Sequence, residues 1–246
     1  MTGFPLLGGD PGAALRELRG RRVNFHPAEV EPRRWHLDEH RCFLARERPG
    51  PPVRGGAWEV ACGLVRDYEF SEPELVRAVY DRRADLLGRD MLLEGRFHGI
   101  RFTMGVRVTD VLERTGTSGR HGWGWAYETL EGHLERGRMS YEVVKDVGSG
   151  SVELVITGCS QRTPALGPVL RFGWLLFGRH TQLRFYRRCG PRLRALVRAR
   201  LAGSVLPPPL RRGDLVLAPS EARLGFLDRA ALRNHHPAGP APRRAR

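Results

Sequence analysis

The chain has 246 residues, of which 41% are hydrophobic, so it can bury a substantial core without disulfides or a structural metal. Its longest strongly apolar run, residues 172–177, is far shorter than the roughly 20 residues of a membrane-spanning helix, and no signal peptide is expected. The net charge is +14, but the last third alone is basic, with 18 arginines and three acidic residues from position 162 onward. Four cysteines without CxxC spacing are typical of reduced thiols, so we expect a cytoplasmic protein.

Residues 1–55 are predicted to be an irregular N-terminal lead-in, because proline and glycine are frequent and the segment closes on a turn-rich run at 49–56. Residues 58–70 mix valine, leucine and aromatic residues and predict a first strand. Ser71 and Glu74 form a capping-box pattern ahead of apolar residues at helical spacing, so a shorter helix is expected to begin at Ser71.

Five strand-like segments follow at the spacing of antiparallel hairpins, at residues 92–96, 100–111, 122–130, 139–146 and 152–159. In the third segment Trp123, Trp125, Tyr127 and Thr129 share one face, and Glu128 is expected on the opposite surface. A face with three large aromatic side chains is either part of the core or the wall of a ligand site.

After Pro164 the apolar residues recur at the spacing of an α-helix. One arc of the predicted helix carries apolar residues and the other carries arginines: Phe185, Tyr186, Cys189, Leu193, Leu196 and Val197 against Arg184, Arg187, Arg188, Arg194 and Arg198. A kink or a restart is expected at Gly190-Pro191, because an interior proline costs about 3 kcal/mol. Residues 204–246 are rich in proline and arginine and predict a mobile tail.

The order of these elements predicts an α+β fold. Residues 56–203 are expected to form a helix-grip-like domain, in which a curved antiparallel sheet wraps on a long C-terminal helix, with one shorter helix after the first strand. Such an arrangement often leaves an apolar cavity between the sheet and the helix.

The run of residues 129–133, Thr-Leu-Glu-Gly-His, follows the aromatic residues Trp125 and Tyr127. With them it resembles the signature of an uncharacterised family catalogued as domain of unknown function nineteen-ninety, and the resemblance covers roughly residues 20–203. The resemblance implies no established activity, and the family's element order is similar to that of helix-grip proteins for hydrophobic ligands. The chain departs from the family at Cys159, where an aromatic residue is frequent and whose small side chain would enlarge a cavity, and at Gly190-Pro191.

The leading hypothesis is a binding module for a small apolar or aromatic ligand between the sheet and the terminal helix. Its wall is expected to include Phe102, Met104, Trp125, Tyr127 and Thr129, and its polar contacts to come from His133 or Arg179.

Alternatives from other classes stay open. An enzyme on the same scaffold would use His133 as a general acid or base oriented by Glu128 or Glu131, whereas a structural His133 would cap a turn. An interaction protein would bind nucleic acid or an anionic surface through the arginine face and tail, a pattern that a solvated surface also produces. His36 and His40 have the spacing of metal ligands on a helix but lack a third ligand, so neither a metal nor another cofactor is expected.

Overall fold

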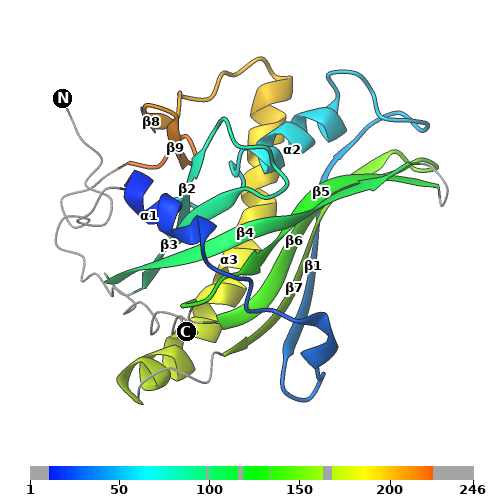
Figure 1. Ribbon diagram of the computed structural model, residues 1–246. Helices are drawn as coiled ribbons and strands as arrows, with labels where there is room; N and C mark the ends of the chain where they lie inside the picture. The colour runs from blue at the N-terminus through cyan, green and yellow to red at the C-terminus, as the bar shows by residue number, and fades with distance from the viewer. Residues whose placement is uncertain (1–10, 98–99, 116–118, 134, 163–167, 224–246) are drawn as a thin grey trace.

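The computed structural model describes residues 11–97, 100–115, 119–133, 135–162 and 168–223 (Figure 1). The helices are α1 (Pro11–Arg19), α2 (Ala57–Arg66) and α3 (Pro168–Leu201), and Pro27–Glu29 forms a 3₁₀ turn. The strands are β1 (His36–Arg46), β2 (Val76–Asp81), β3 (Asp90–Phe97), β4 (Ile100–Arg114), β5 (Arg120–Thr129), β6 (Glu135–Asp146), β7 (Ser151–Arg162), β8 (Leu210–Arg212) and β9 (Leu215–Ala218). None of the helices in these ranges is long and apolar enough to cross a membrane.

Within the described residues the strands form one nine-stranded antiparallel sheet in the order β1-β7-β6-β5-β4-β3-β2-β9-β8. The sheet curves around α3, and α2 packs beside α3 on the same face, whereas α1 lies on the other face (Figure 1). This is the helix-grip arrangement, so the predicted α+β fold is confirmed, with an antiparallel sheet packed on a long C-terminal helix.

The register of the strands determines which side chains face the helices. Tyr127 on β5 pairs with Met139 on β6, which pairs with Gly158 on β7, which in turn pairs with Asp38 on β1. These residues form one row across the sheet, and Trp125 belongs to the next row on the same face. We call this surface, which faces α2 and α3, the interior face.

The core divides between the two faces of the sheet. On the interior face, the predicted apolar arc of α3 is confirmed, because Phe185, Tyr186, Cys189, Leu193, Leu196 and Val197 are all buried. On the other face, a smaller cluster joins α1 to the sheet through Leu15, Leu18, Leu92, Leu130 and Leu217. Both faces of β2 and β3 are therefore covered.

The prediction of a strand over 58–70 and a helix from Ser71 is wrong, because the two segments have the opposite structures. In α2 the buried residues Ala57, Ala61, Leu64 and Val65 fall on one side of a helix. In β2 Ala78 faces the main core while Val79 faces the α1 cluster. A strand that is apolar on both faces has no clear period of two, and so the sequence pattern resembles that of a helix.

The segment predicted as an irregular lead-in, 1–55, and the segment predicted as a mobile tail, 204–246, both contain strands of the sheet. Strand β1 is an edge strand whose side chains are mostly exposed or half-buried, with only Leu44 buried, so it lacks an apolar alternation. Strands β8 and β9 extend the opposite edge of the sheet next to β2. The part of the predicted tail from 224 to 246 lies outside the described residues.

Helix α3 continues through Gly190 and Pro191, so the predicted restart is wrong. Pro191 is exposed, whereas Gly190 is buried against β1, where an added Cβ would overlap the Cys42 side chain. The glycine lets α3 lie close to β1, and apolar side chains on both sides of this point hold the helix on the sheet.

Candidate functional site

Polar side chains gather on the interior face under the middle of α3. Arg179 on α3 donates hydrogen bonds from its two terminal nitrogens to the two carboxylate oxygens of Asp38 on β1, at 2.5 and 2.6 Å. Arg179 also donates to the side-chain oxygen of Gln182 at 2.9 Å, and Gln182 donates to the Ser160 hydroxyl at 3.2 Å. These contacts connect α3 to both β1 and β7.

The Arg179–Asp38 pair lies at the rim of the interior, since the Asp38 side chain is 10% exposed and that of Arg179 is 35% exposed. The hydrogen bonds from Arg179 lower the pKa of Asp38 despite its burial, and the same bonds raise the pKa of Arg179. A bidentate pair of this kind is strong and directional. Asp38 is therefore ionised at neutral pH and holds the guanidinium in one orientation.

Glu135 at the start of β6 lies on the same face as Met139 and Tyr141. Burial raises the pKa of its half-buried carboxyl to about 8; Arg179 lowers this pKa and Asp38 raises it further. At neutral pH Glu135 is mostly protonated, so its carboxyl can both donate and accept a hydrogen bond. The sequence analysis did not identify Glu135, although its even spacing from Met139 and Tyr141 marks it as an inward-facing carboxyl.

Aromatic rings occupy the interior face beside this polar group. Tyr127 lies 6.2 Å from Trp125 and 6.1 Å from Tyr141 between ring centroids, and Tyr68 and Phe70 complete the cluster. Trp125 is 1% exposed and donates from Nε1 to the Val65 carbonyl at 3.1 Å.

The hydroxyls of Tyr68 and Tyr141 are buried and make no hydrogen bond of normal length to any residue that the structure describes. Burial raises the pKa of both tyrosines well above its usual value, so both hydroxyls keep their protons. A buried hydroxyl without a hydrogen bond raises the free energy of the folded state, and a polar partner would lower it again.

His133 and Thr129 lie in the turn between β5 and β6. The Glu135 backbone N–H donates to His133 Nδ1 at 2.9 Å, and the His133 N–H donates to the Leu130 carbonyl at 3.0 Å. Thr129 Oγ1 accepts from the Gly137 N–H at 2.9 Å. These contacts are those of side chains that stabilise a turn, and they favour the capping interpretation of His133.

The two carboxylates that we expected beside His133 contact other residues. Glu128 is on the face away from α3, where it accepts a hydrogen bond from Arg138 at 3.0 Å. Glu131 is exposed and accepts from the Arg22 N–H at 3.3 Å. Acid–base catalysis by His133 stays a prediction to which these contacts add no support.

The remaining predicted wall residues lie farther along the sheet. Met104 on β4 is partly buried and packs against the main core near Gly95. Phe102 pairs with Gly95, and its side chain lies outside the described part of the molecule. Cys159 pairs with Leu37 and is on the face away from α3, so the expectation that it enlarges an interior cavity is wrong.

His36 and His40 are on a strand, which changes the meaning of their spacing. The ring of His40 lies 5.0 Å from that of Tyr186, and Asp38 between the two histidines is bonded to Arg179. Among the described residues no three histidine, cysteine or acidic side chains are grouped to hold a metal ion.

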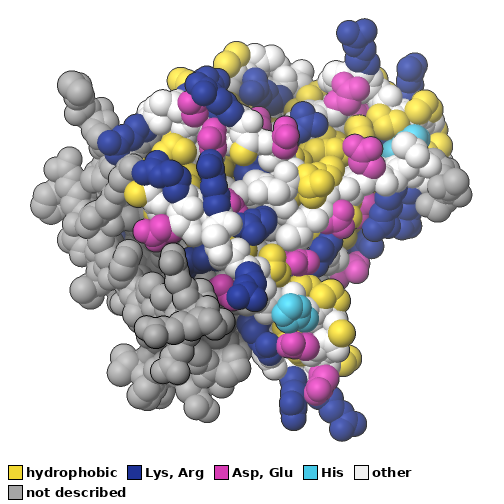
Figure 2. All heavy atoms as spheres, viewed as in Figure 1, with side chains coloured by type: hydrophobic (Ala, Val, Ile, Leu, Met, Phe, Trp, Pro, Cys, Tyr) yellow, Lys and Arg dark blue, Asp and Glu magenta, His cyan; other side chains and the backbone are white. Residues whose placement is uncertain are grey.

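Some arginines on the polar side of α3 form hydrogen bonds within the protein. Arg194 donates to the Phe43 carbonyl and to Cys42, whereas Arg187 and Arg188 are exposed. On the face shown in Figure 2, basic and acidic side chains are interspersed and form no continuous basic surface. Binding of nucleic acid or an anionic surface stays a prediction.

Taken together, the fold and the polar group under α3 define a helix-grip protein with charged and hydroxyl groups on its interior face. The chain belongs to the family described as domain of unknown function (DUF1990), whose model matches residues 21–192. No curated protein matches the sequence.

Several solved structures are similar to this chain. An aromatase/cyclase (Zhui) from Streptomyces sp. R1128 is 16% identical, with a TM-score of 0.41, over 70% of this chain and 99% of that chain. Human STARD10 is 9% identical, with a TM-score of 0.41, over 89% of this chain and 98% of that chain. A hypothetical protein from Helicobacter pylori is 12% identical, with a TM-score of 0.42, over 79% of this chain and 98% of that chain. These values are too low to assign a ligand or an activity.

Proposed function

We propose that the protein binds a small, mainly apolar or aromatic molecule between the sheet and α3. The observation that supports this most strongly is that Tyr127, Glu135 and the Arg179–Asp38 pair share one end of an otherwise apolar interior face. Small-molecule sites combine a mostly apolar lining with a few well-placed polar groups, which is the composition found here.

Each group has a distinct role in this proposal. Trp125 and Tyr127 supply flat apolar contact. Glu135, mostly protonated at neutral pH, donates a hydrogen bond to a ligand oxygen, and Arg179 supplies a positive charge whose orientation Asp38 maintains. The ligand class is therefore an apolar or aromatic molecule with one carbonyl, hydroxyl or carboxylate oxygen. The four free cysteines fit a reducing compartment, and we propose the cytoplasm as the location.

Mass spectrometry of the natively purified protein, followed by titration with the fluorescent probe 8-anilinonaphthalene-1-sulfonate, tests the proposal. We expect an apolar small molecule to co-purify and the emptied protein to bind the probe saturably. Glu135→Gln should weaken retention of the natural ligand by about threefold to tenfold, because an amide N–H donates a weaker hydrogen bond than a carboxylic O–H.

Glu128→Gln is the matched control, because Glu128 is on the neighbouring strand β5 and its side chain is on the opposite face of the sheet from Glu135. This variant should retain the ligand as the unmodified protein does. Absence of any bound molecule together with absence of saturable probe binding would contradict the proposed function. Equal effects of Glu135→Gln and Glu128→Gln would place the ligand elsewhere.

A further inference from the structure

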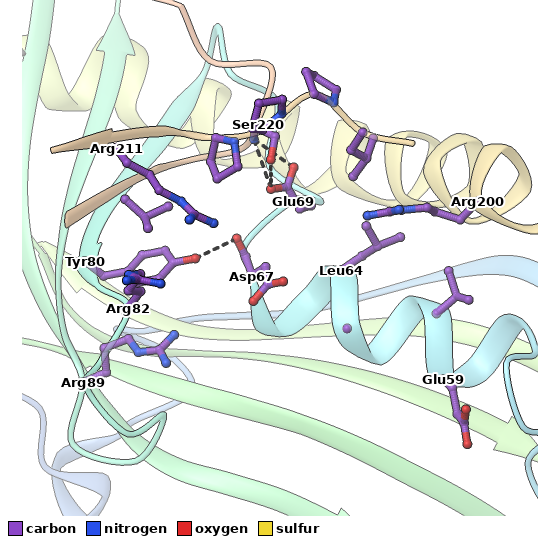
Figure 3. A pocket seen from close by; sticks show the side chains of 17 residues that line it. Glu59, Leu64, Asp67, Glu69, Tyr80, Arg82, Arg89, Arg200, Arg211 and Ser220 are labelled. Atoms are coloured by element: carbon purple, nitrogen blue, oxygen red, sulfur yellow. Dashed lines mark hydrogen bonds between the residues drawn. The ribbon is translucent and has the colours of Figure 1, made fainter. Parts of the chain in front are cut away.

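A pocket of about 610 Å³ lies at the C-terminal end of α3, far from Arg179. It is bounded by α2, by β2, by residues 206–209 and by the edge strands β8 and β9 (Figure 3). Arg200 in this pocket and Arg179 in the first site are 21 positions apart on α3, about 31 Å along a helix. The two sites are therefore separate.

Some charged groups that line the pocket are already paired. Glu69 accepts hydrogen bonds from the Ser220 N–H at 2.9 and 3.1 Å and from the Ser220 hydroxyl at 2.5 Å. Glu59 accepts from the Gly55 N–H at 2.7 Å, and Arg82 forms an ion pair with Asp214 at 3.6 Å. These groups have little capacity left for a ligand.

Four other charged groups face the open space of the pocket. Figure 3 shows Arg89, Arg200 and Arg211 directed toward the region around Asp67 and Tyr80 from three different elements. Arg89 is 9% exposed and lies over the Tyr80 ring at 4.8 Å. One of its terminal nitrogens donates to the Ala84 carbonyl at 2.9 Å, and its buried Nε has no hydrogen-bond partner among the described residues. Within those same residues the side chains of Asp67, Arg200 and Arg211 form no hydrogen bond or ion pair.

The electrostatics of the pocket agree with this arrangement. Burial raises the pKa of Asp67, and Arg66, Arg89 and Arg200 partly oppose this rise. Burial also lowers the pKa of Arg89, because its charge is poorly hydrated. Four arginines and three carboxylates line the pocket and leave an excess of one positive charge. The convergence of Arg89, Arg200 and Arg211 on one open space suits a phosphate monoester, which carries about −1.5 to −2 at pH 7.

We infer that this pocket binds a small phosphate monoester that carries hydroxyl groups. Arg89, Arg200 and Arg211 contact the phosphate oxygens, and Asp67 accepts a hydrogen bond from a ligand hydroxyl. Leu64, Leu206 and Pro208 provide the apolar wall for the rest of the molecule. The volume is much larger than a phosphate ion needs and lies in the usual range for organic ligands, roughly 300–1,000 Å³.

Calorimetric titrations of the full-length protein at an ionic strength of about 0.1 M, with inorganic phosphate, ribose 5-phosphate and ribose as probes, test this inference. Ribose 5-phosphate should bind saturably and more tightly than phosphate, and ribose should not bind measurably. In the double variant Arg200→Ala/Arg211→Ala its affinity should fall at least about tenfold, because two charge-assisted contacts are lost. Both arginines are exposed, so the variant should fold normally, as circular dichroism can verify.

The control is Arg187→Ala/Arg188→Ala, which removes the same charge from exposed positions of α3 outside the pocket. It should leave the affinity unchanged within about twofold, since exposed charges at this distance are largely screened. Equal losses in the two double variants would overturn the inference, as would failure of both phosphate compounds to bind.

Asp67→Asn separates the role of the carboxylate, which contacts a ligand hydroxyl, from that of the arginines, which contact the phosphate. It should strengthen binding of inorganic phosphate, because a repelling charge is removed, while reducing the preference for ribose 5-phosphate over phosphate. An unchanged preference would overturn the assigned contact between Asp67 and a hydroxyl. Equal affinity of the unmodified protein for both phosphate compounds would overturn the monoester as the ligand.

Discussion

Glu135 illustrates how the position of a single side chain determines its protonation state. A carboxyl at the end of an exposed strand would ionise near pH 4.5, but burial beside Asp38 raises the pKa of Glu135 to about 8. The nearby positive charge of Arg179 only partly opposes this rise. Burying such a group destabilises the free protein, and the group is useful when a ligand oxygen accepts a hydrogen bond from it.

The raised pKa of Glu135 predicts a specific pH dependence of stability. Because the folded-state pKa lies above the unfolded value, the protonated carboxyl favours the fold fully below pH 4.5, and this contribution is lost as the pH rises to about 8. Between these pH values the free energy of unfolding should fall by up to about 1.4 kcal/mol per pH unit from this group. Urea unfolding from pH 5 to pH 8.5 measures the slope.

Glu135→Gln should flatten that slope, because glutamine has the same shape and does not ionise. Glu128→Gln should leave the slope as it is in the unmodified protein. A Glu135→Gln protein with the original slope would show that other groups account for the pH dependence.

At the scale of elements, α3 depends on one close contact with the edge strand β1. Gly190 allows the helix backbone to approach Cys42, and Arg194 adds hydrogen bonds to Cys42 and to the Phe43 carbonyl. The proline that follows Gly190 removes one helix hydrogen bond at an exposed position. Packing therefore keeps α3 continuous where local preference alone would interrupt it.

Gly190→Ala should destabilise the protein by about 1–3 kcal/mol, because the added methyl group overlaps the Cys42 side chain. The matched control is Gly63→Ala in α2, where an added Cβ meets no atom within 4 Å. That substitution should stabilise the protein by about 0.5–1 kcal/mol through the better helix propensity of alanine. Urea unfolding of both variants measures the difference, and the same sign of change in both would contradict this account of α3.

At the scale of the whole molecule, ion pairs lie at both ends of the interior face. Arg179 and Asp38 form one pair, and Lys145 and Glu47 form the other with an Nζ to carboxylate distance of 2.6 Å. Lys145, the chain's one lysine, is fully buried and also donates to the Pro51 carbonyl at 2.8 Å. Glu47 in addition accepts from the Val53 and Trp58 N–H groups. The second pair thus connects the C-terminal end of β6 to the segment that leads into α2.

Lys145→Met should destabilise the protein by about 3–5 kcal/mol, because it leaves the Glu47 carboxylate buried without its counter-charge. The double variant Lys145→Met/Glu47→Gln should recover part of this loss, since glutamine carries no charge and its one side-chain oxygen can still accept one of the two backbone hydrogen bonds. Chemical unfolding of the single and double variants tests this. A double variant less stable than Lys145→Met would contradict the explanation.

The amino-acid pattern alone determined the element order from β3 to α3, the shared face of Trp125 and Tyr127, and the apolar arc of α3, because a hydrophobic period survives in any structure that buries one face. Only the tertiary structure showed that α2 is a helix and β2 is a strand. Strand β2 is buried on both faces, so its sequence has no clear hydrophobic period. Edge strand β1 also escaped prediction, because its few buried positions leave a mostly polar sequence.

Of the candidate site, the sequence predicted Tyr127 as an inward-facing side chain, and its choice of His133 or Arg179 as the polar contact of a ligand stays a prediction. Only the tertiary structure decided that Asp38 binds Arg179 and that His133 accepts a hydrogen bond from the Glu135 backbone. It also placed Glu135 on the interior face with Asp38 and Arg179. These contacts join residues that are up to 141 positions apart. Sequence periodicity reports which face a residue occupies, whereas the register between distant strands and the approach of α3 determine which residues meet.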